Sequence, residues 1–169
     1  MLTKIAAYIT RSKVAKQSLV REKHFLNWDK INKIALVIDD KEVINKSELD
    51  KFTEGLKKHI EIFFVELKSK QPTFGDWKCL SKKNKNILNL PKDFFLNEIK
   101  EKKYDLVINA SLQYSVFSAN LINHLNAPFK CGNNNLFGEL DLIIETRESE
   151  SLLSYLKEVV KYLAMIKTG

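Results

Sequence analysis

The stretch from residue 103 to residue 132 (KYDLVINASLQYSVFSANLINHLNAPFKCG) constrains the fold more than any other part of the chain. Between Asp105 and Lys130 it contains no Asp, Glu, Lys or Arg, although 29% of the whole chain is charged. Its apolar run at 106–108 is typical of a strand buried on both faces of a parallel sheet. Four large apolar residues then recur at helical spacing, namely Tyr114, Phe117, Leu121 and Leu125. Because the residue before Pro128 is disfavoured in a helix, the chain is expected to extend again, which predicts a central βαβ unit.

The rest of the chain alternates between strand and helix patterns. Residues 34–38 and 60–67 predict strands, and between them Asn45 and Glu48 have the spacing of a helix capping box. Shorter strands are expected at 78–80, 86–88 and 140–144. Further helices are expected at 3–24, from Pro91 onwards, at 114–125 and at 149–167.

This alternation predicts an α/β fold, a three-layer Rossmann-like sandwich with a mostly parallel sheet, preceded by a basic N-terminal helix. The expected domains are a helical arm at 1–30 and a single α/β domain at 31–169. With 169 residues the chain is long enough to bury its own core.

The net charge of +7 is concentrated near the N-terminus. Eight Lys or Arg and two acidic residues stand among residues 1–33, so about +6 belongs there and about +1 to the remainder. Such asymmetry indicates contact with an anionic surface, either nucleic acid or membrane headgroups. The expected contact residues are Lys4, Arg11, Lys13, Lys16, Arg21 and Lys23. The alternative is an ordinary solvated helix.

A ligand crevice is expected where two strands of the sheet end. In parallel α/β sheets, ligands bind at the carboxyl ends of strands, at the point where the strand order reverses. If the strand at 34–38 neighbours the strand at 104–109, four polar residues face this crevice, namely Asp39, Asp40, Asn109 and Ser111. The alternative is that these side chains cap helices and close turns.

Motifs of common catalytic sites are missing. The five glycines are too scattered for a phosphate-binding loop, and no nucleophile elbow surrounds Ser111. The three histidines are isolated from one another and from Cys79 and Cys131. Cys131 could act as a nucleophile only if a base approached it, and the alternative is a small buried apolar residue. No catalytic residue, metal ligand or cofactor is therefore predicted, and whether the protein is an enzyme stays open.

Cellular location is also constrained by composition. The short apolar run at 5–9 is no export signal, and no stretch approaches the ~20 apolar residues that span a membrane. Two cysteines are too few for a disulfide scaffold, so a reducing cytoplasm is expected.

The helix expected at 114–125 has an unusual polar face. Opposite its apolar stripe stand only uncharged side chains and one histidine: Gln113, Ser115, Ser118, Asn120, Asn123 and His124. Small uncharged polar groups are cheaper to bury than charges when each finds a hydrogen bond. We therefore expect a second layer on this helix, either the N-terminal arm or a second copy in a homodimer.

Two resemblances follow from these residues. The strand at 103–109 (KYDLVIN), with the segment at 126–132 (NAPFKCG), resembles a unit in the N-terminal half of heptosyltransferase-type glycosyltransferases, although Asn109 stands where that family has Asp. Over nearly its whole length the chain resembles a family of short, uncharacterised bacterial proteins of unknown function. They share the basic N-terminal helix, the 104–109 strand and the later strand at 141–144. This resemblance implies an α/β fold and a cytoplasmic setting, and no reaction.

Two functions remain as hypotheses. The first is a non-enzymatic binding module whose basic N-terminal helix contacts an anionic partner. The second is a small-molecule enzyme or binding protein, of the nucleotide or sugar type, that uses the strand-end crevice with Asp39 or Asp40 as acid/base or metal ligand.

Overall fold

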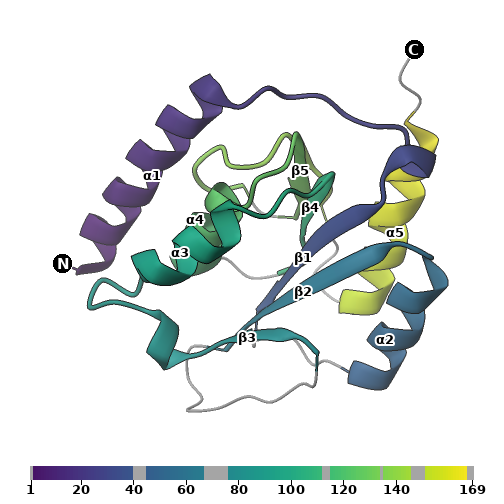
Figure 1. Cartoon of the computed structure of the whole chain (residues 1–169), viewed down its shortest axis with the longest axis horizontal. Helices are drawn as coiled ribbons and strands as arrows, with labels where there is room; N and C mark the ends of the chain where they lie inside the picture. The colour runs from purple at the N-terminus through teal and green to yellow at the C-terminus, as the bar shows by residue number, and fades with distance from the viewer. Residues whose placement is uncertain are drawn as a thin grey trace.

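A computed structural model of the chain describes residues 2–39, 45–66, 76–111, 115–133, 135–145 and 151–166. Asp40, Gln113 and Tyr114, all singled out above, lie outside these ranges. In the described part, strands and helices alternate along the chain as the sequence patterns predicted. Figure 1 shows the strands as a central twisted sheet with helices on either side.

The sheet is parallel throughout its described strands. They are β1 (Lys33–Asp39), β2 (His59–Val65), β3 (Lys78–Leu80), β4 (Leu106–Asn109), β5 (Phe129–Gly132) and β6 (Leu142–Ile143), in the spatial order β3-β2-β1-β4-β5-β6. Leu36 in β1 stands opposite Ile62 in β2 and Ile108 in β4. All four residues of β4 are buried, because apolar side chains fill both faces of the central strands.

Helices cover both faces of this sheet, which confirms the predicted Rossmann-like α/β fold. On one face α2 (Lys46–Gly55) and α5 (Leu152–Met165) pack with one set of β1 side chains, for example Leu156 with Leu36. On the other face α3 (Asp93–Lys100) and α4 (Val116–His124) pack with the alternate set, for example Leu121 with Val37. Two single-turn helices, Trp28–Lys30 and Lys82–Asn84, lie in the connections.

The N-terminal helix α1 (Leu2–Val20) forms an additional layer outside α4. Figure 1 shows it at the edge of the molecule, on the side away from α2 and α5. Its buried residues Ala6, Thr10 and Val14 are spaced one turn apart and make one inward face. Thr10 Oγ1 accepts a hydrogen bond of 3.2 Å from Asn120 Nδ2 of α4. The second layer that was expected on the uncharged face of the 114–125 helix, here α4, is therefore α1.

Side-chain caps explain where three of the helices begin. Asn45 accepts from the backbone N–H of Glu48, as the capping pattern predicted, and Ser115 accepts from Ser118 N–H at the start of α4. Ser151 caps α5 in the same way, so this helix begins at Leu152 rather than at 149.

The prediction of a strand at 86–88 was wrong. The Asn86 side chain accepts from the backbone N–H groups of Leu88 and Leu90, which closes a turn in place of a sheet ladder. Lys85 and Pro91 form one isolated antiparallel bridge, and α3 begins at Asp93 rather than at Pro91. α1 also ends before residue 24, since Arg21 leaves the helix to reach the body of the protein.

Candidate functional site

The crevice expected from the sequence lies at the switch point between β1 and β4, the two neighbouring strands from which the chain departs to opposite ends of the sheet. Asp39 ends β1 and Asn109 ends β4, and Ser111 follows two residues later. The register pairs Val37 with Asn109, so Asp39 and Ser111 each lie two residues beyond this pair. Three of the four predicted residues therefore stand at one edge of the sheet, and Asp40 lies outside the described residues.

The polar groups at this edge are deeply buried. Asp39 is 3% exposed, Asn109 is 4% exposed and Ser111 is 1% exposed. Asn109 Oδ1 accepts the backbone N–H of Ser111 at 3.1 Å, so Asn109 closes a turn at the end of β4. Ser111 Oγ has no hydrogen-bond partner among the described residues. A buried hydroxyl without a partner is uncommon and gives this edge one group that a ligand could satisfy.

At Gly132 the neighbouring strand β5 approaches the end of β4 very closely. A Cβ atom at Gly132 would lie 2.5 Å from the backbone oxygen of Asn109, closer than carbon and oxygen can approach. Glycine at this position therefore lets β5 pack against the end of β4.

The predicted anionic-surface residues divide into two groups. Lys4, Arg11 and Lys16 are exposed on α1 and Lys13 is half-buried, and within the described ranges none of these four takes part in an ion pair. The other two, Arg21 and Lys23, follow the helix and are held by the body of the protein.

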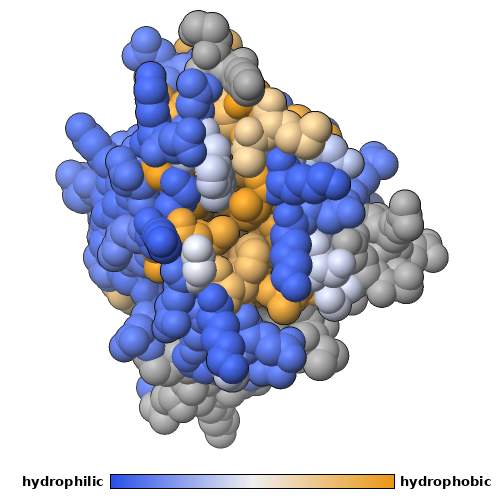
Figure 2. Space-filling model, turned by 90° about the vertical axis from the view of Figure 1, so that its right-hand side faces the viewer, coloured by the Kyte–Doolittle hydropathy of each residue, from blue (hydrophilic) through white to orange (hydrophobic). Residues whose placement is uncertain are grey.

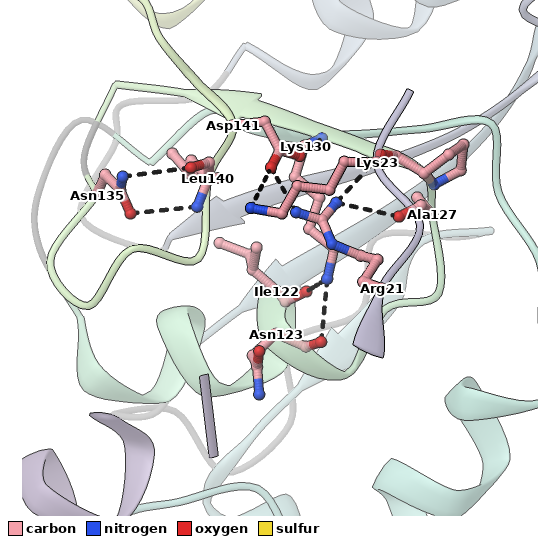
Figure 3. A network of polar contacts seen from close by, with 10 residues as sticks. Arg21, Lys23, Ile122, Asn123, Ala127, Lys130, Asn135, Leu140 and Asp141 are labelled. Carbon is pink, nitrogen blue, oxygen red and sulfur yellow. Dashed lines mark hydrogen bonds and ion pairs between the residues drawn. The ribbon is translucent and has the colours of Figure 1, made fainter. Parts of the chain in front are cut away.

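Arg21 and Lys23 converge on Asp141, which precedes β6 (Figure 3). Arg21 Nη2 lies 2.5 Å from Asp141 Oδ1, and Lys23 Nζ lies 3.2 Å from the same oxygen. Arg21 Nη1 also donates to the carbonyl oxygens of Ala127 and Pro128 at 3.2 and 3.3 Å. Burial alone would raise the pKa of Asp141, but the hydrogen bonds from Arg21 and from the backbone N–H of Lys130 outweigh it and leave this pKa below its ordinary value. This network ties the end of α1 to the sheet.

Lys130 is a buried lysine at the centre of the same region, only 3% exposed. Its Nζ donates to the carbonyl oxygens of Ile122 and Asn123, at 2.7 and 3.0 Å, in the last turn of α4 (Figure 3). These carbonyls have no partner within the helix, and an amino group at this end matches the helix dipole. Burial, reinforced by the charge of Arg21, lowers the pKa of Lys130 to about 7. The sequence signal for it was a single lysine inside an apolar strand.

A cavity of about 270 Å³ lies beside Lys130, between the C-terminal half of α1 and the ends of α3 and α4. Two polar atoms of its lining, Gln17 Oε1 and Asn123 Nδ2, are buried and have no hydrogen-bond partner among the described residues. Sequence reasoning missed this cavity, because it expected a layer on the 114–125 helix but gave no register between that helix and the N-terminal arm.

Apolar side chains are exposed on the side of the molecule where α5 lies (Figure 2). One apolar hollow of about 560 Å³ is lined by residues of β6 and of the end of α5: Leu142, Ile143, Ile144, Glu145, Tyr162, Met165 and Ile166.

Cys131 is completely buried in β5, and burial raises the pKa of its thiol. A thiol held in its neutral form is a poor nucleophile, which favours the interpretation as a small core residue. In the part of the chain that the structure describes, no three His, Cys, Asp or Glu side chains group together as metal ligands would. None of the described helices is long and apolar enough to cross a bilayer.

Comparison with known proteins places the chain in a family. Residues 3–166 match DUF6913, which is described as a family of unknown function. No curated protein matches the chain, and no solved structure matches it either. The local resemblance to heptosyltransferase-type glycosyltransferases therefore finds no support in these comparisons, whereas the resemblance over the whole length to a family of unknown function is confirmed.

Proposed function

This chain belongs to the DUF6913 family, whose function is unknown, and from that premise we propose that it is a non-enzymatic interaction module that contacts an anionic partner through α1. In this proposal the α/β body holds the helix, and the helix makes the contact. The body carries little of the net charge, so the N-terminal segment is the main source of the excess of cations.

One observation carries the proposal, the charge on the outward face of α1. Its cations Lys4, Arg11 and Lys16 are exposed and without an ion-pair partner among the described residues. No Asp or Glu occurs between Leu2 and Arg21. A surface with cations and no compensating acids attracts anions over roughly a Debye length, ~8 Å at physiological salt.

The packing of α1 supports the same proposal. Ala6, Thr10 and Val14 hold the helix against α4, and Arg21 ties its end to Asp141. An anionic partner therefore meets a helix that is already formed and held, so binding costs little backbone conformational entropy.

The test compares charge reversals at two places. The triple variant Lys4→Glu, Arg11→Glu, Lys16→Glu is expected to lose binding to heparin and to anionic vesicles in low salt. The matched control reverses three exposed lysines of α2 and α5, Lys51→Glu, Lys157→Glu and Lys161→Glu, and has the same net charge. If both variants lose binding equally, net charge and not α1 is responsible. If neither loses binding, α1 is not the contact surface.

A second candidate is the small-molecule enzyme or binding protein of the nucleotide or sugar type. The observation in its favour is the buried and unpartnered Ser111 Oγ beside Asp39 at the switch point. In this function Asp39 or Asp40 would act as acid/base or metal ligand. Titration calorimetry with nucleotides and nucleotide sugars tests it. If a nucleotide or nucleotide sugar binds and Ser111→Ala weakens this binding, the result favours this candidate. If none binds and Ser111→Ala raises the stability of the protein, the hydroxyl is only an unsatisfied group of the core.

A further inference from the structure

Helix α1 exposes apolar side chains as well as cations. Of the twelve large hydrophobic residues exposed in the described part of the chain, five lie on this one helix of 19 residues. They are Leu2 (51% exposed), Ile5 (42%), Tyr8 (75%), Leu19 (88%) and Val20 (85%). Scattered exposed apolar residues need no explanation, but such a concentration on one element indicates a binding surface.

Helix geometry places the apolar and basic side chains of α1 in a definite pattern. Tyr8 and Leu19 are eleven residues apart, which at about 100° per residue is three turns and about 20°, so both point the same way. By the same count they point opposite Thr10, which faces α4. Lys4 and Arg11 lie on one flank of this apolar line and Lys16 lies on the other.

We infer that the outward face of α1 docks on an anionic lipid bilayer, with Tyr8 and Leu19 in the headgroup layer and Lys4, Arg11 and Lys16 on lipid phosphates. This inference rests on the proposed function and names its partner. Helices that lie in a membrane interface combine an apolar line with flanking cations in this way. The long stems of Lys and Arg let their charges reach the phosphates while the apolar residues insert.

Other partners fit this face less well. Nucleic-acid backbones are bound by cations and polar groups, and an exposed Leu19 would have no role there. A second copy of the chain docked on this face through its own α1 would bring cations against cations with no acid between them, which opposes association. An anionic bilayer complements both the charge and the apolar side chains.

The experiment measures cosedimentation of the full-length chain with phosphatidylcholine vesicles, with and without phosphatidylglycerol, beside its binding to double-stranded DNA. The diagnostic variant is Tyr8→Ser with Leu19→Ser, which keeps every charge. Its matched control is Ile87→Ser with Tyr162→Ser, two residues that are exposed outside α1. Circular dichroism checks that both variants are folded.

We expect the wild type and the control variant to bind only the vesicles that contain phosphatidylglycerol. The Tyr8/Leu19 variant should lose on the order of tenfold in vesicle affinity. In the Lys4/Arg11/Lys16 variant, each charge reversal should lower the vesicle affinity about fivefold or more. Wild-type affinity in the Tyr8/Leu19 variant would overturn the inference, as would tighter binding of the wild type to DNA than to vesicles. In the latter case the proposed function survives, since an anionic partner is still bound. Binding to neither surface would overturn both.

Discussion

The tether between Arg21 and Asp141 is expected to hold α1 on the body, and Asp141→Asn is the perturbation that tests it. The substitution keeps the shape of the side chain and one oxygen that can accept the backbone N–H of Lys130. It removes the charge that faces Arg21 at 2.5 Å. The Arg21 side chain is 16% exposed and that of Asp141 8%, so the pair is largely shielded from water.

The magnitude follows from this burial. Exposed ion pairs contribute about 0–1 kcal/mol, whereas breaking a fully buried pair costs about 3–5 kcal/mol. The pair lies between these limits, and Arg21 keeps its bonds to two carbonyl oxygens. We therefore expect Asp141→Asn to lower the free energy of unfolding by about 2–3 kcal/mol. Lys23→Met should cost under ~1 kcal/mol, because the Lys23 side chain is 43% exposed.

The assay is urea unfolding of the wild type, Asp141→Asn, Arg21→Met and the double variant at pH 7. Residues in contact should give a coupling energy of about 1–2 kcal/mol in this cycle. Because the folded-state pKa of Asp141 is lowered, its contribution is present above the unfolded pKa of about 3.9 and is lost as the pH falls through the folded value. The wild type and Asp141→Asn should therefore converge in stability toward acid. Additive single effects, or a difference that persists at low pH, would refute the reasoning.

Three further predictions concern the interior. Gly132→Ala should destabilise the protein by about 3 kcal/mol in urea unfolding, since its Cβ meets the Asn109 backbone, whereas Gly55→Ala, with open space around it, should be neutral. The stability of the wild type relative to Lys130→Met should rise between pH 7 and about 10, because there the unfolded chain binds a proton that folded Lys130 has released; a flat difference would contradict its lowered pKa. The double variant Ser118→Glu, Asn120→Glu should lower the free energy of unfolding by several kcal/mol, because both side chains lie buried under α1. The control substitutions Asn97→Glu and Ser154→Glu, at exposed helix positions, should each cost under ~0.5 kcal/mol. A neutral result in thermal unfolding would mean that α1 does not cover α4 in solution.

Sequence patterns were sufficient for the central strands and for the fold class. β1, β2 and β4 contain runs rich in Ile, Val, Leu and Phe, and such runs indicate burial on both faces of a parallel sheet. Alternation with helices then implies a parallel sheet with covered faces. The same reasoning put Asp39 and Asn109 at the carboxyl ends of two strands and left the adjacency of these strands as a condition, which the structure meets. Local signals failed at 86–88, where one asparagine side chain competes with the sheet for backbone hydrogen bonds.

The tertiary structure alone decided which charges are free and which are used inside the molecule. Six cations of the N-terminal segment are equivalent in the sequence, yet Arg21 and Lys23 meet an aspartate about 120 residues away while Lys4, Arg11 and Lys16 face outward. Neither composition nor periodicity reports such a pairing, because it depends on where α1 lies relative to β5 and β6. The small inward face of α1, with Ala6, Thr10 and Val14, likewise gives a weak periodic signal. The uncharged face of α4 indicated that some layer covers this helix, with α1 or a second copy as the candidates, and the tertiary structure identified the layer as α1.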